Sequence, residues 1–438
     1  MARAILPRRL LLAAAATTAT AARLAKSDHV RSIPMGRAEH CIFIWLGGGA
    51  CQIDTWDPKA MGDPANRKAG SAYESIPTAI QGVRICQHLN ACAAILDRFV
   101  VIRTIHHDVI DEHARATNQV HTGRPTAGTI VYPSIGSAVA VARGPLDDRL
   151  PPYVLIGFPN VTRGPGILGA RGGYVYLTDT TVGPAGFARQ PEVTEARQRR
   201  RDELIESMRR GTRDDSALPQ VVRDYDLAAR QAARMAGPGF MDIFRLEKEA
   251  DGMREAYGGE FGQRLLLSRR LVERGVRFVE VSHNLGFING TGWDTHNSGQ
   301  LKQHLLIQEL DRGLAALVRD LETRGLLDRT VIALGTEFGR PAGFDGGGGR
   351  GHHSKCFSLA LAGGGLRTGV AIGTSDESGM AIVDEPVSIP DYHATIHAAL
   401  GTDPAMEFFD GDRPVPITDG GRPIARLFAT DSSQPRSF

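Results

Sequence analysis

The sequence has 438 residues, 42% hydrophobic and 23% charged, which is enough for one large soluble α/β domain with insertions or for two domains. Its 51 Lys and Arg residues against 49 Asp and Glu residues leave a formal charge of +2, which argues against a dedicated nucleic-acid-binding surface. The five cysteines form no C-x-x-C pair and are odd in number, so they indicate neither a zinc ribbon nor a disulfide framework.

Residues 1–38 have the layout of a bacterial export signal followed by a linker. Arg8 and Arg9 precede a stretch of Leu and Ala that ends in small residues, and the two arginines suggest the twin-arginine route. The stretch is too short and too rich in Ala for a membrane span; the alternative is a disordered or frayed start of a cytoplasmic protein. We predict an exported, periplasmic or extracellular protein that is not stably inserted in a membrane once the signal is removed.

Residues 39–430 are predicted to form a single domain, followed by a disordered tail at 431–438. Short runs of apolar, β-branched and aromatic residues between turn residues predict strands in this domain. The runs are 41–46, 99–104, 153–157, 276–281, 330–334 and 357–362. Because helical segments separate them, the sequence predicts an α/β fold with a mostly parallel sheet sandwiched by helices.

Two parts of the domain are predicted to be helical. One helix has its N-cap at Asn297 or Ser298, apolar positions in 4-4-3-4 spacing, and a stop at Gly325. A helical insertion is predicted around 188–274, where Arg-rich segments favour a solvated cap over an anion-binding surface.

The first predicted strand runs into Gly47, Gly48 and Gly49, which allow a tight turn or the close approach of a ligand. A phosphate-binding loop is disfavoured because neither G-x-x-x-x-G-K-[ST] nor G-x-G-x-x-G is present. The alternatives that stay open are a metal-binding turn, with Asp54 as the ligand, and a purely structural turn. Asp57 precedes Pro58 and suits turn initiation.

Ligand-type side chains follow other strands too, in 106–125, in 292–297 and in 335–353. Carboxylates and neutral imidazoles can hold a divalent ion such as zinc or manganese, which would polarise a phosphoryl, sulfuryl or acyl oxygen and activate water. Each stretch also has a structural explanation: Asp294 could cap a helix, and Glu337 could form a salt bridge with Arg340. Several such strand ends together predict a metal site at the carboxyl edge of the sheet.

The ordered motifs GGGACQIDTWDPK, HTGRP, GWDTH, GTEFGRP, GRGHH and DYHATIHAALG, from residue 40 to about 402, resemble the bacterial domain-of-unknown-function family 1501. That family is a sulfatase-like branch of the alkaline phosphatase superfamily. The resemblance implies an alkaline phosphatase-like core with a divalent-metal hydrolase site at the strand ends. The export signal predicted at the start of the chain is also similar to what members of that family usually carry.

The resemblance further implies which residues form the site. The implied metal ligands are Asp54, Asp294, His296, Glu337 and His352. Glu337 stands at the Asp position of an Asp-His-Gly motif and Phe338 where its His would be, so one ligand of a second metal is missing. Cys51 stands where relatives usually have Ser.

The position of the nucleophile in sulfatases corresponds to His113, and the chain has no formylglycine motif. His113 could be a metal ligand, a general base or a covalent nucleophile, and we favour ligand or base. Arg340 or Arg350 would bind the anionic group of the substrate.

The sequence therefore predicts a sulfatase-like, metal-dependent hydrolase of phosphate or sulfate esters. Its cofactor would be zinc, calcium, magnesium or manganese, and its substrate a small anionic ester or a glycan. The alternative is a non-catalytic exported member of the fold that binds an anionic ligand or partner. The missing second-metal ligand and formylglycine motif favour this alternative, whereas a complete site would favour the enzyme.

Overall fold

The computed structural model describes residues 35–126, 128–157, 164–180, 183, 184, 187, 192–210, 219–235, 238–283, 292–296, 300 and 302–428. The segment with Arg8 and Arg9, the proposed N-cap residues Asn297 and Ser298, and the tail at 431–438 lie outside the described residues.

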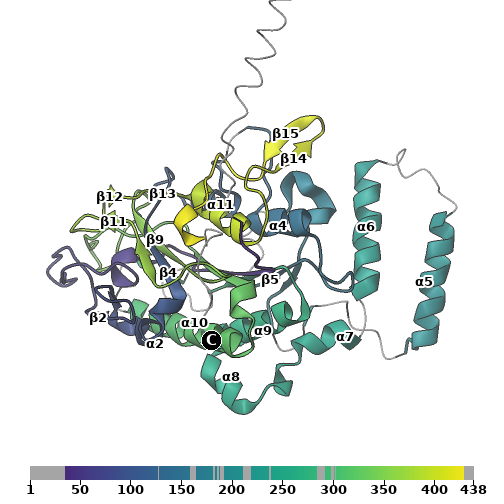
Figure 1. The fold of residues 1–438 in the computed structure, drawn as a ribbon, viewed down its shortest axis with the longest axis horizontal. Coiled ribbons are helices and arrows are strands. Elements are labelled where there is room, and N and C mark those ends of the chain that lie inside the picture. The colour runs from purple at the N-terminus through teal and green to yellow at the C-terminus, as the bar shows by residue number, and fades with distance from the viewer. Residues whose placement is uncertain are drawn as a thin grey trace, which may run out of the picture.

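A nine-stranded sheet forms the centre of the molecule (Figure 1). Its strands occur in the order β10 (Val370–Ile372), β4 (Phe99–His106), β9 (Phe357–Gly363), β8 (Thr330–Gly335), β1 (His40–Trp45), β7 (Phe278–Ser282), β5 (Tyr153–Ile156) and β6 (Val175–Leu177), and β13 (Val387–Ser388) also pairs with β4. The six strands predicted from the sequence are all present, with ends that differ from the prediction by two residues at most.

Strand β9 runs opposite to its neighbours β4 and β8, and the other pairs in this sheet are parallel. The predicted class, a mostly parallel sheet between helices, is confirmed. The direction of β9 was not predicted. It matters for function because the beginning of β9 lies at the edge where the parallel strands end.

The two faces of the sheet bury alternate residues of each strand. In β1, Ile42 and Ile44 belong to one hydrophobic core, whereas Cys41, Phe43 and Trp45 belong to the other. A strand that buries both faces reads as a continuous apolar run, and this explains the sequence of β1.

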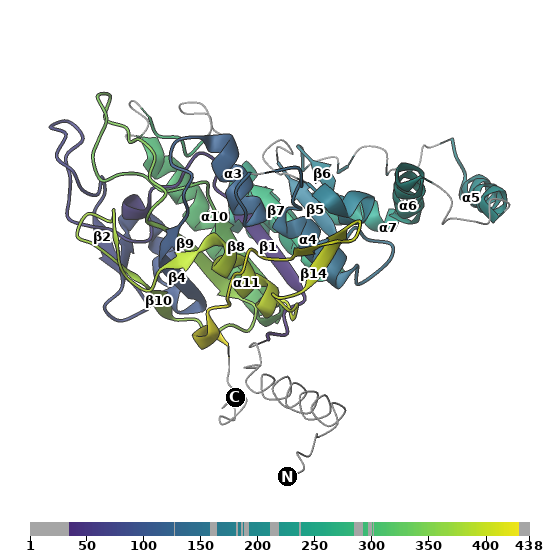
Figure 2. The same cartoon turned by 90° about the horizontal axis from the view of Figure 1, so that it is seen from above.

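Helices cover both faces (Figures 1 and 2). The core around Ile42 contains leucines of α9 (Glu260–Arg274) and α10 (Gln303–Thr323). The opposite core contains residues of α3 (His113–Thr122), α4 (Ile135–Arg143) and α11 (Ile389–Ala399). Helix α10 is the helix predicted before the fifth strand, and Gly325 follows its end with a left-handed φ of 67°.

The range 188–274 contains further helices beside α9. They are α5 (Glu195–Arg210), α6 (Gln220–Met235), α7 (Pro238–Met241) and α8 (Asp251–Tyr257). Figures 1 and 2 both show α6 beside the main body and α5 farther out. Thus α9 is part of the layer on the sheet, whereas α5 is exposed along most of its length.

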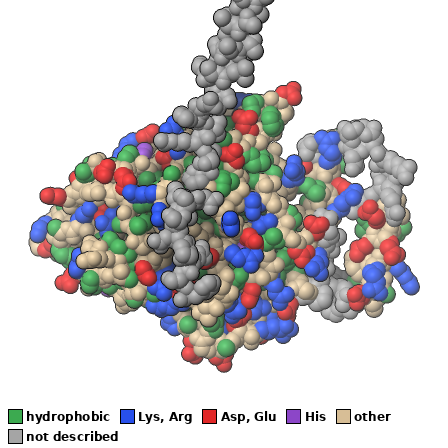
Figure 3. All heavy atoms as spheres, viewed as in Figure 1, with side chains coloured by type: hydrophobic (Ala, Val, Ile, Leu, Met, Phe, Trp, Pro, Cys, Tyr) green, Lys and Arg blue, Asp and Glu red, His purple; other side chains and the backbone are tan. Residues whose placement is uncertain are grey.

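The described chain also contains one short helix and three small sheets. They are helix α2 (Asn90–Ala93) and the two-stranded sheets β2 (Ser75–Pro77) with β3 (Arg84–Cys86), β11 (Thr374–Ser375) with β12 (Ile382–Asp384), and β14 (Glu407–Asp410) with β15 (Arg413–Pro416). Among the described helices, none has the length and apolar character needed to span a membrane. On the face shown in Figure 3, basic and acidic side chains are interspersed.

Candidate metal centre

The site lies at the carboxyl edge of the sheet, where three adjacent strands end together. Trp45 of β1 pairs with Ser282 of β7 and with Gly335 of β8, so the chain leaves these strands at one level. The residues after β7 and β8 supply Asp294 and Glu337 to this edge. Helix α3 begins there with His113, and the reversed strand β9 is preceded there by His352. Segments distant in sequence therefore converge at the crevice where ligands bind in sheets of this kind.

The glycine turn after β1 is bound by two side chains from the segment after β8. The Gly48 amide donates to both carboxylate oxygens of Glu337, at 2.9 and 2.7 Å. Arg340 Nε donates to the Gly49 carbonyl at 2.9 Å, and Arg340 also donates to the Gly48 carbonyl. Gly49 has a φ of 96°, and a Cβ there would lie 2.8 Å from the ring of Phe338. The turn therefore requires glycine at residue 49.

Three ligand atoms meet beside this turn. His113, Asp294 and His352 each offer one N or O atom, and these atoms lie within 4.8 Å of one another. His113 Nε2 is 3.6 Å from Asp294 Oδ2, and His352 Nε2 is 3.8 Å from Asp294 Oδ1. Two imidazoles and a carboxylate suit zinc or another divalent transition metal.

His296 lies beside two members of this group of three. Its Nε2 lies 2.9 Å from His352 Nε2 and 3.3 Å from Asp294 Oδ1. Two imidazole nitrogens that face each other need either a proton or a cation between them. We refer to His113, Asp294, His296 and His352 as the four-residue cluster.

The side chains around the cluster are fixed by further contacts. Asp294 Oδ1 accepts from Arg340 Nη2 at 2.7 Å, and His352 Nδ1 lies 2.9 Å from Asp111 Oδ1. Such partners orient metal ligands and set their protonation. Phe338, with no exposed surface, lies against the rings of His113 and His352, with centroid distances of 5.0 and 4.4 Å.

Electrostatics of the cluster follow from these contacts. Burial disfavours the charged form of His113, but Asp294 and Glu337 on its two nitrogens raise its pKa to about 9. Burial would raise the pKa of Asp294, but His113, His352 and Arg340 hold it well below its usual value. Burial lowers the pKa of His296. Asp294 and His296 are therefore in the forms that bind a metal, and His113 must lose a proton to do so.

Glu337 touches the cluster at its edge. Its Oε1 lies 3.7 Å from His113 Nδ1, and only about a twentieth of its side chain is exposed. Glu337 and Arg340, considered above as a salt bridge, instead have different partners. Glu337 accepts from the Gly48 amide, and Arg340 pairs with Asp294. Glu337 is thus a neighbour of the cluster rather than one of its four members.

Asp54, expected as a ligand from the first strand, lies in a different environment. Its carboxylate pairs with Arg350 Nε at 2.9 Å, and neither side chain has exposed surface. It also accepts from the Ala72 amide at 2.7 Å and from Gln300 Nε2 at 2.5 Å. These partners occupy the carboxylate oxygens, and Asp54 is not in the group of ligand atoms that meet within 4.8 Å.

The two arginines expected to bind a substrate anion are fully engaged within the protein. Arg340 donates to Asp294 and to the carbonyls of Gly48, Gly49, Trp293, Arg350 and Gly351. Arg350 donates to Asp54 and to the carbonyls of Gly70, Pro341 and Ala342. Since a guanidinium has five N–H donors, both groups are saturated. Their geometry gives them a structural role in this conformation.

Two residues near the cluster were not singled out from the sequence. Asp111 contacts His352, and Asp345 Oδ2 lies 3.7 Å from His296 Nδ1. Asp345 lies in the glycine-rich loop and Asp111 just before α3, so a carboxylate count within those two stretches could have found them. Cys51 is fully buried, and burial raises the pKa of its thiol, which makes it a poor nucleophile.

Fold and site together define an α/β protein with a candidate divalent-metal centre at the carboxyl edge of its sheet. The chain belongs to the family described as "Protein of unknown function (DUF1501)", whose model matches residues 38–428. The predicted family membership is thereby confirmed. None of the curated proteins matches the sequence.

Several solved structures are similar to this chain. The PsFucS1 sulfatase from Pseudoalteromonas sp. has a TM-score of 0.40 and 13% identity, with 98% of this chain and 78% of that chain covered. The phosphonate monoester hydrolase SpPMH from Silicibacter pomeroyi has a TM-score of 0.37 and 11% identity, covering 90% and 78%. A protein in the alkaline phosphatase superfamily from Vibrio parahaemolyticus has a TM-score of 0.36 and 9% identity, covering 84% and 69%. At these scores, function must be inferred from the residues of this chain.

Proposed function

We propose that the four-residue cluster binds one divalent metal ion and that the protein is a metal-dependent hydrolase of phosphate or sulfate esters. The observation that carries the proposal is the convergence of ligand atoms from α3, from the segment after β7 and from the segment before β9 within 4.8 Å. His113 and His352 are 239 positions apart in the chain, so this convergence is a property of the fold. Among zinc, manganese, magnesium and calcium, three imidazoles and one carboxylate favour zinc.

The bound ion would supply a Lewis acid that polarises the ester and lowers the pKa of water. The chain supplies the arrangement of the ligands. Arg340 orients Asp294, Asp111 orients His352, and the Gly48 amide keeps the Glu337 carboxylate beside His113. Phe338 excludes water from one side of the cluster, which strengthens electrostatic interactions there. We accordingly assign Arg340 to positioning rather than to substrate binding.

A second candidate function is binding of an anionic ligand or partner without turnover. It is supported by Phe338, which stands in place of a second-metal ligand. The hydrolase needs the metal, so metal content tests it first, and a turnover assay separates the two functions.

The first experiment measures the metal content of the purified protein for the wild type, His352→Ala and His353→Ala. The adjacent histidine is the matched control, because His353 Nε2 contacts the Met380 carbonyl at 2.8 Å, outside the cluster. We expect about one ion per chain in the wild type and in His353→Ala. In His352→Ala we expect the affinity for the metal to fall at least tenfold, so that less metal remains bound after purification. An equal metal content in all three proteins would contradict the proposed centre.

The second experiment tests turnover with aryl phosphates and aryl sulfates on the same three proteins. Hydrolysis that is lost in His352→Ala and kept in His353→Ala supports the hydrolase. A stoichiometric metal without hydrolysis of either ester class would favour the binding function.

We also propose that the protein acts after export. The proposal rests on Arg8, Arg9 and the Leu- and Ala-rich stretch that follows them. Cell fractionation of the wild type and of an Arg8→Lys/Arg9→Lys double variant tests it. Retention of the double variant in the cytoplasm with export of the wild type would support the twin-arginine route, and a cytoplasmic wild type would contradict export.

A further inference from the structure

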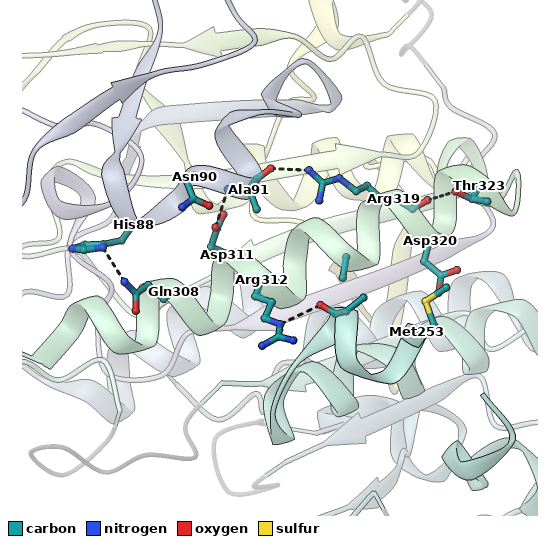
Figure 4. A pocket seen from close by; sticks show the side chains of 12 residues that line it. His88, Asn90, Ala91, Met253, Gln308, Asp311, Arg312, Arg319, Asp320 and Thr323 are labelled. Atoms are coloured by element: carbon teal, nitrogen blue, oxygen red, sulfur yellow. Dashed lines mark hydrogen bonds between the residues drawn. The ribbon is translucent and has the colours of Figure 1, made fainter. Parts of the chain in front are cut away.

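A pocket of about 530 Å³ lies on the outer side of α10, between α2 and α8 (Figure 4). None of the residues that line it belongs to the four-residue cluster. Its volume lies within the range of small-molecule sites, which is about 300–1,000 Å³. The pocket is therefore a separate feature that the proposed hydrolase does not use.

Small side chains on three helices create this hollow. Ala91 of α2, Ala256 of α8 and Ala316 of α10 all line it, and Met253 adds a flexible apolar surface beside Ala256. Three alanines where helices meet leave a volume that larger residues would have filled. The walls thus offer apolar contact to a bound molecule.

The acidic side chains of the pocket are already satisfied. Asp311 accepts from the amides of Ala91 and Cys92, at 2.9 and 2.7 Å. Asp320 accepts from the Tyr257 hydroxyl at 2.9 Å, from Arg269 Nε at 2.8 Å and from Arg324 Nε at 2.7 Å. A cationic ligand would find these carboxylates occupied.

The basic side chains differ from each other. Arg312 donates to the carbonyls of Glu255 and Ala256 at the end of α8, so it closes that helix. Arg319 makes one long hydrogen bond, at 3.4 Å, to the Ala91 carbonyl, and has no ion pair among the described residues. Figure 4 shows Arg319 extending along α10 toward Ala91. Most of its five N–H donors are available to a ligand.

The opposite end of the pocket presents polar groups. His88 Nδ1 lies 3.1 Å from Gln308 Nε2, and with Nδ1 as the acceptor the ring keeps a donor at Nε2. Burial lowers the pKa of His88, which favours this neutral form. Gln308 and Arg319 are eleven residues apart on α10, or about 16 Å along the helix. The pocket is thus elongated, with a cation at one end and a neutral donor at the other.

We propose that this pocket binds a small organic anion with a largely apolar body. The anionic group lies on the Arg319 guanidinium, and the body covers Ala91, Ala256 and Ala316. The site is independent of the four-residue cluster and of the metal.

The test measures the binding of 2-naphthoate and of its neutral analogue 2-naphthamide by calorimetry. The proteins are the wild type, Arg319→Gln, Ala316→Leu and Arg254→Gln. Arg254 is a matched control, because it lies on α8, does not line the pocket and is 3.8 Å from Asp251. We expect 2-naphthoate to bind the wild type and Arg254→Gln alike, and Arg319→Gln about tenfold more weakly, as for the loss of a charged hydrogen bond.

Ala316→Leu fills the hollow, so we expect it to bind 2-naphthoate more weakly than the wild type does. Thermal unfolding first verifies that this variant folds. Arg319→Gln alters an exposed side chain and keeps the test valid if Ala316→Leu fails to fold. We expect 2-naphthamide to bind the wild type about as weakly as 2-naphthoate binds Arg319→Gln. No binding of 2-naphthoate to the wild type, or equal binding to Arg319→Gln, would overturn the proposal.

Discussion

The carboxylate of Asp54 meets the guanidinium of Arg350 at 2.9 Å where neither side chain has any exposed surface. The pair joins the turn after β1 to the glycine-rich loop before β9. Burying two charges is costly, but removing only one partner costs more, because the other charge is left without compensation. Asp54 is therefore expected to act on stability and not on metal binding.

Asp54→Asn tests this role directly. The variant keeps the shape of the side chain and removes its charge, so we expect the free energy of unfolding to fall by about 3–5 kcal/mol while the metal content stays unchanged. Denaturant unfolding and metal analysis are the two measurements. Asp108→Asn is the control, since its exposed pair with Lys355 is worth at most about 1 kcal/mol. A folded Asp54→Asn protein that contains no metal would indicate that Asp54 is a metal ligand.

Arg340→Lys is expected to affect both stability and metal affinity. Lys cannot reproduce the guanidinium donors that bind Asp294 and the glycine turn. We expect a loss of about 1–3 kcal/mol in the free energy of unfolding, because buried carbonyl groups are left without a donor, and of about 10–100-fold in metal affinity. Arg329→Lys, at an exposed pair with Glu39, should change neither by much. Unchanged metal affinity in a folded Arg340→Lys protein would show that Asp294 needs no orientation by residue 340.

Gly49→Ala and Gly82→Ala form a second matched pair. Both glycines have positive φ, at 96° and 78°, so both substitutions incur a backbone cost of about 1–2 kcal/mol. Only at residue 49 does the new Cβ meet the Phe338 ring, because nothing lies within 4 Å at residue 82. We expect Gly49→Ala to be the more destabilising by about 1–3 kcal/mol in denaturant unfolding. Equal losses would mean that Phe338 moves aside freely.

The buried side chain of His397 is expected to make the stability of the protein depend on pH. It is fully buried in α11, neither ring nitrogen has a hydrogen-bond partner among the described residues, and burial lowers its pKa to about 3. In the unfolded chain the pKa is about 6.5. As the folded-state value is the lower one, the stabilisation is present above pH 6.5 and is lost as the pH falls toward 3.

His397→Leu should remove this dependence. Below pH 6 the slope of the free energy of unfolding against pH is expected to decrease by about 1.4 kcal/mol per pH unit, the value for one proton. At pH 7 the variant should be at least as stable as the wild type, since two unsatisfied nitrogens are gone. Urea unfolding at pH 7, 5.5 and 4.5 measures both effects. An unchanged slope would show that His397 gains its proton in the folded state.

The strands and the site differ in how far sequence could predict them. The apolar run of β1 and the glycines after it fix a buried strand and its turn, because each signal is local and has few structural alternatives. Asp54 is different. A carboxylate after a strand serves equally as a metal ligand or as the partner of a buried arginine, and the choice depends on Arg350, which lies 296 positions away.

The same limit applies to Arg340 and to the direction of β9. A sequence shows that an arginine follows β8 but not that six oxygen acceptors surround it. Strand direction leaves little trace in a short apolar run, since the antiparallel strand β9 is buried on both faces, as β8 is. His352 and His353 are adjacent, and only the backbone geometry between them decides which one faces the cluster.

The antiparallel bridge between Gly339 and His353 closes the base of the excursion that carries Arg340, Asp345 and His352. Its two hydrogen bonds, at 2.9 and 3.0 Å, hold the ends of that excursion together whatever lies between them. The tip at 343–349 is consequently a natural place for insertions and deletions, since a change of length there leaves His352 anchored one residue from the bridge. Exchange of this tip offers a way to reshape the surroundings of the metal centre while its ligands stay in place.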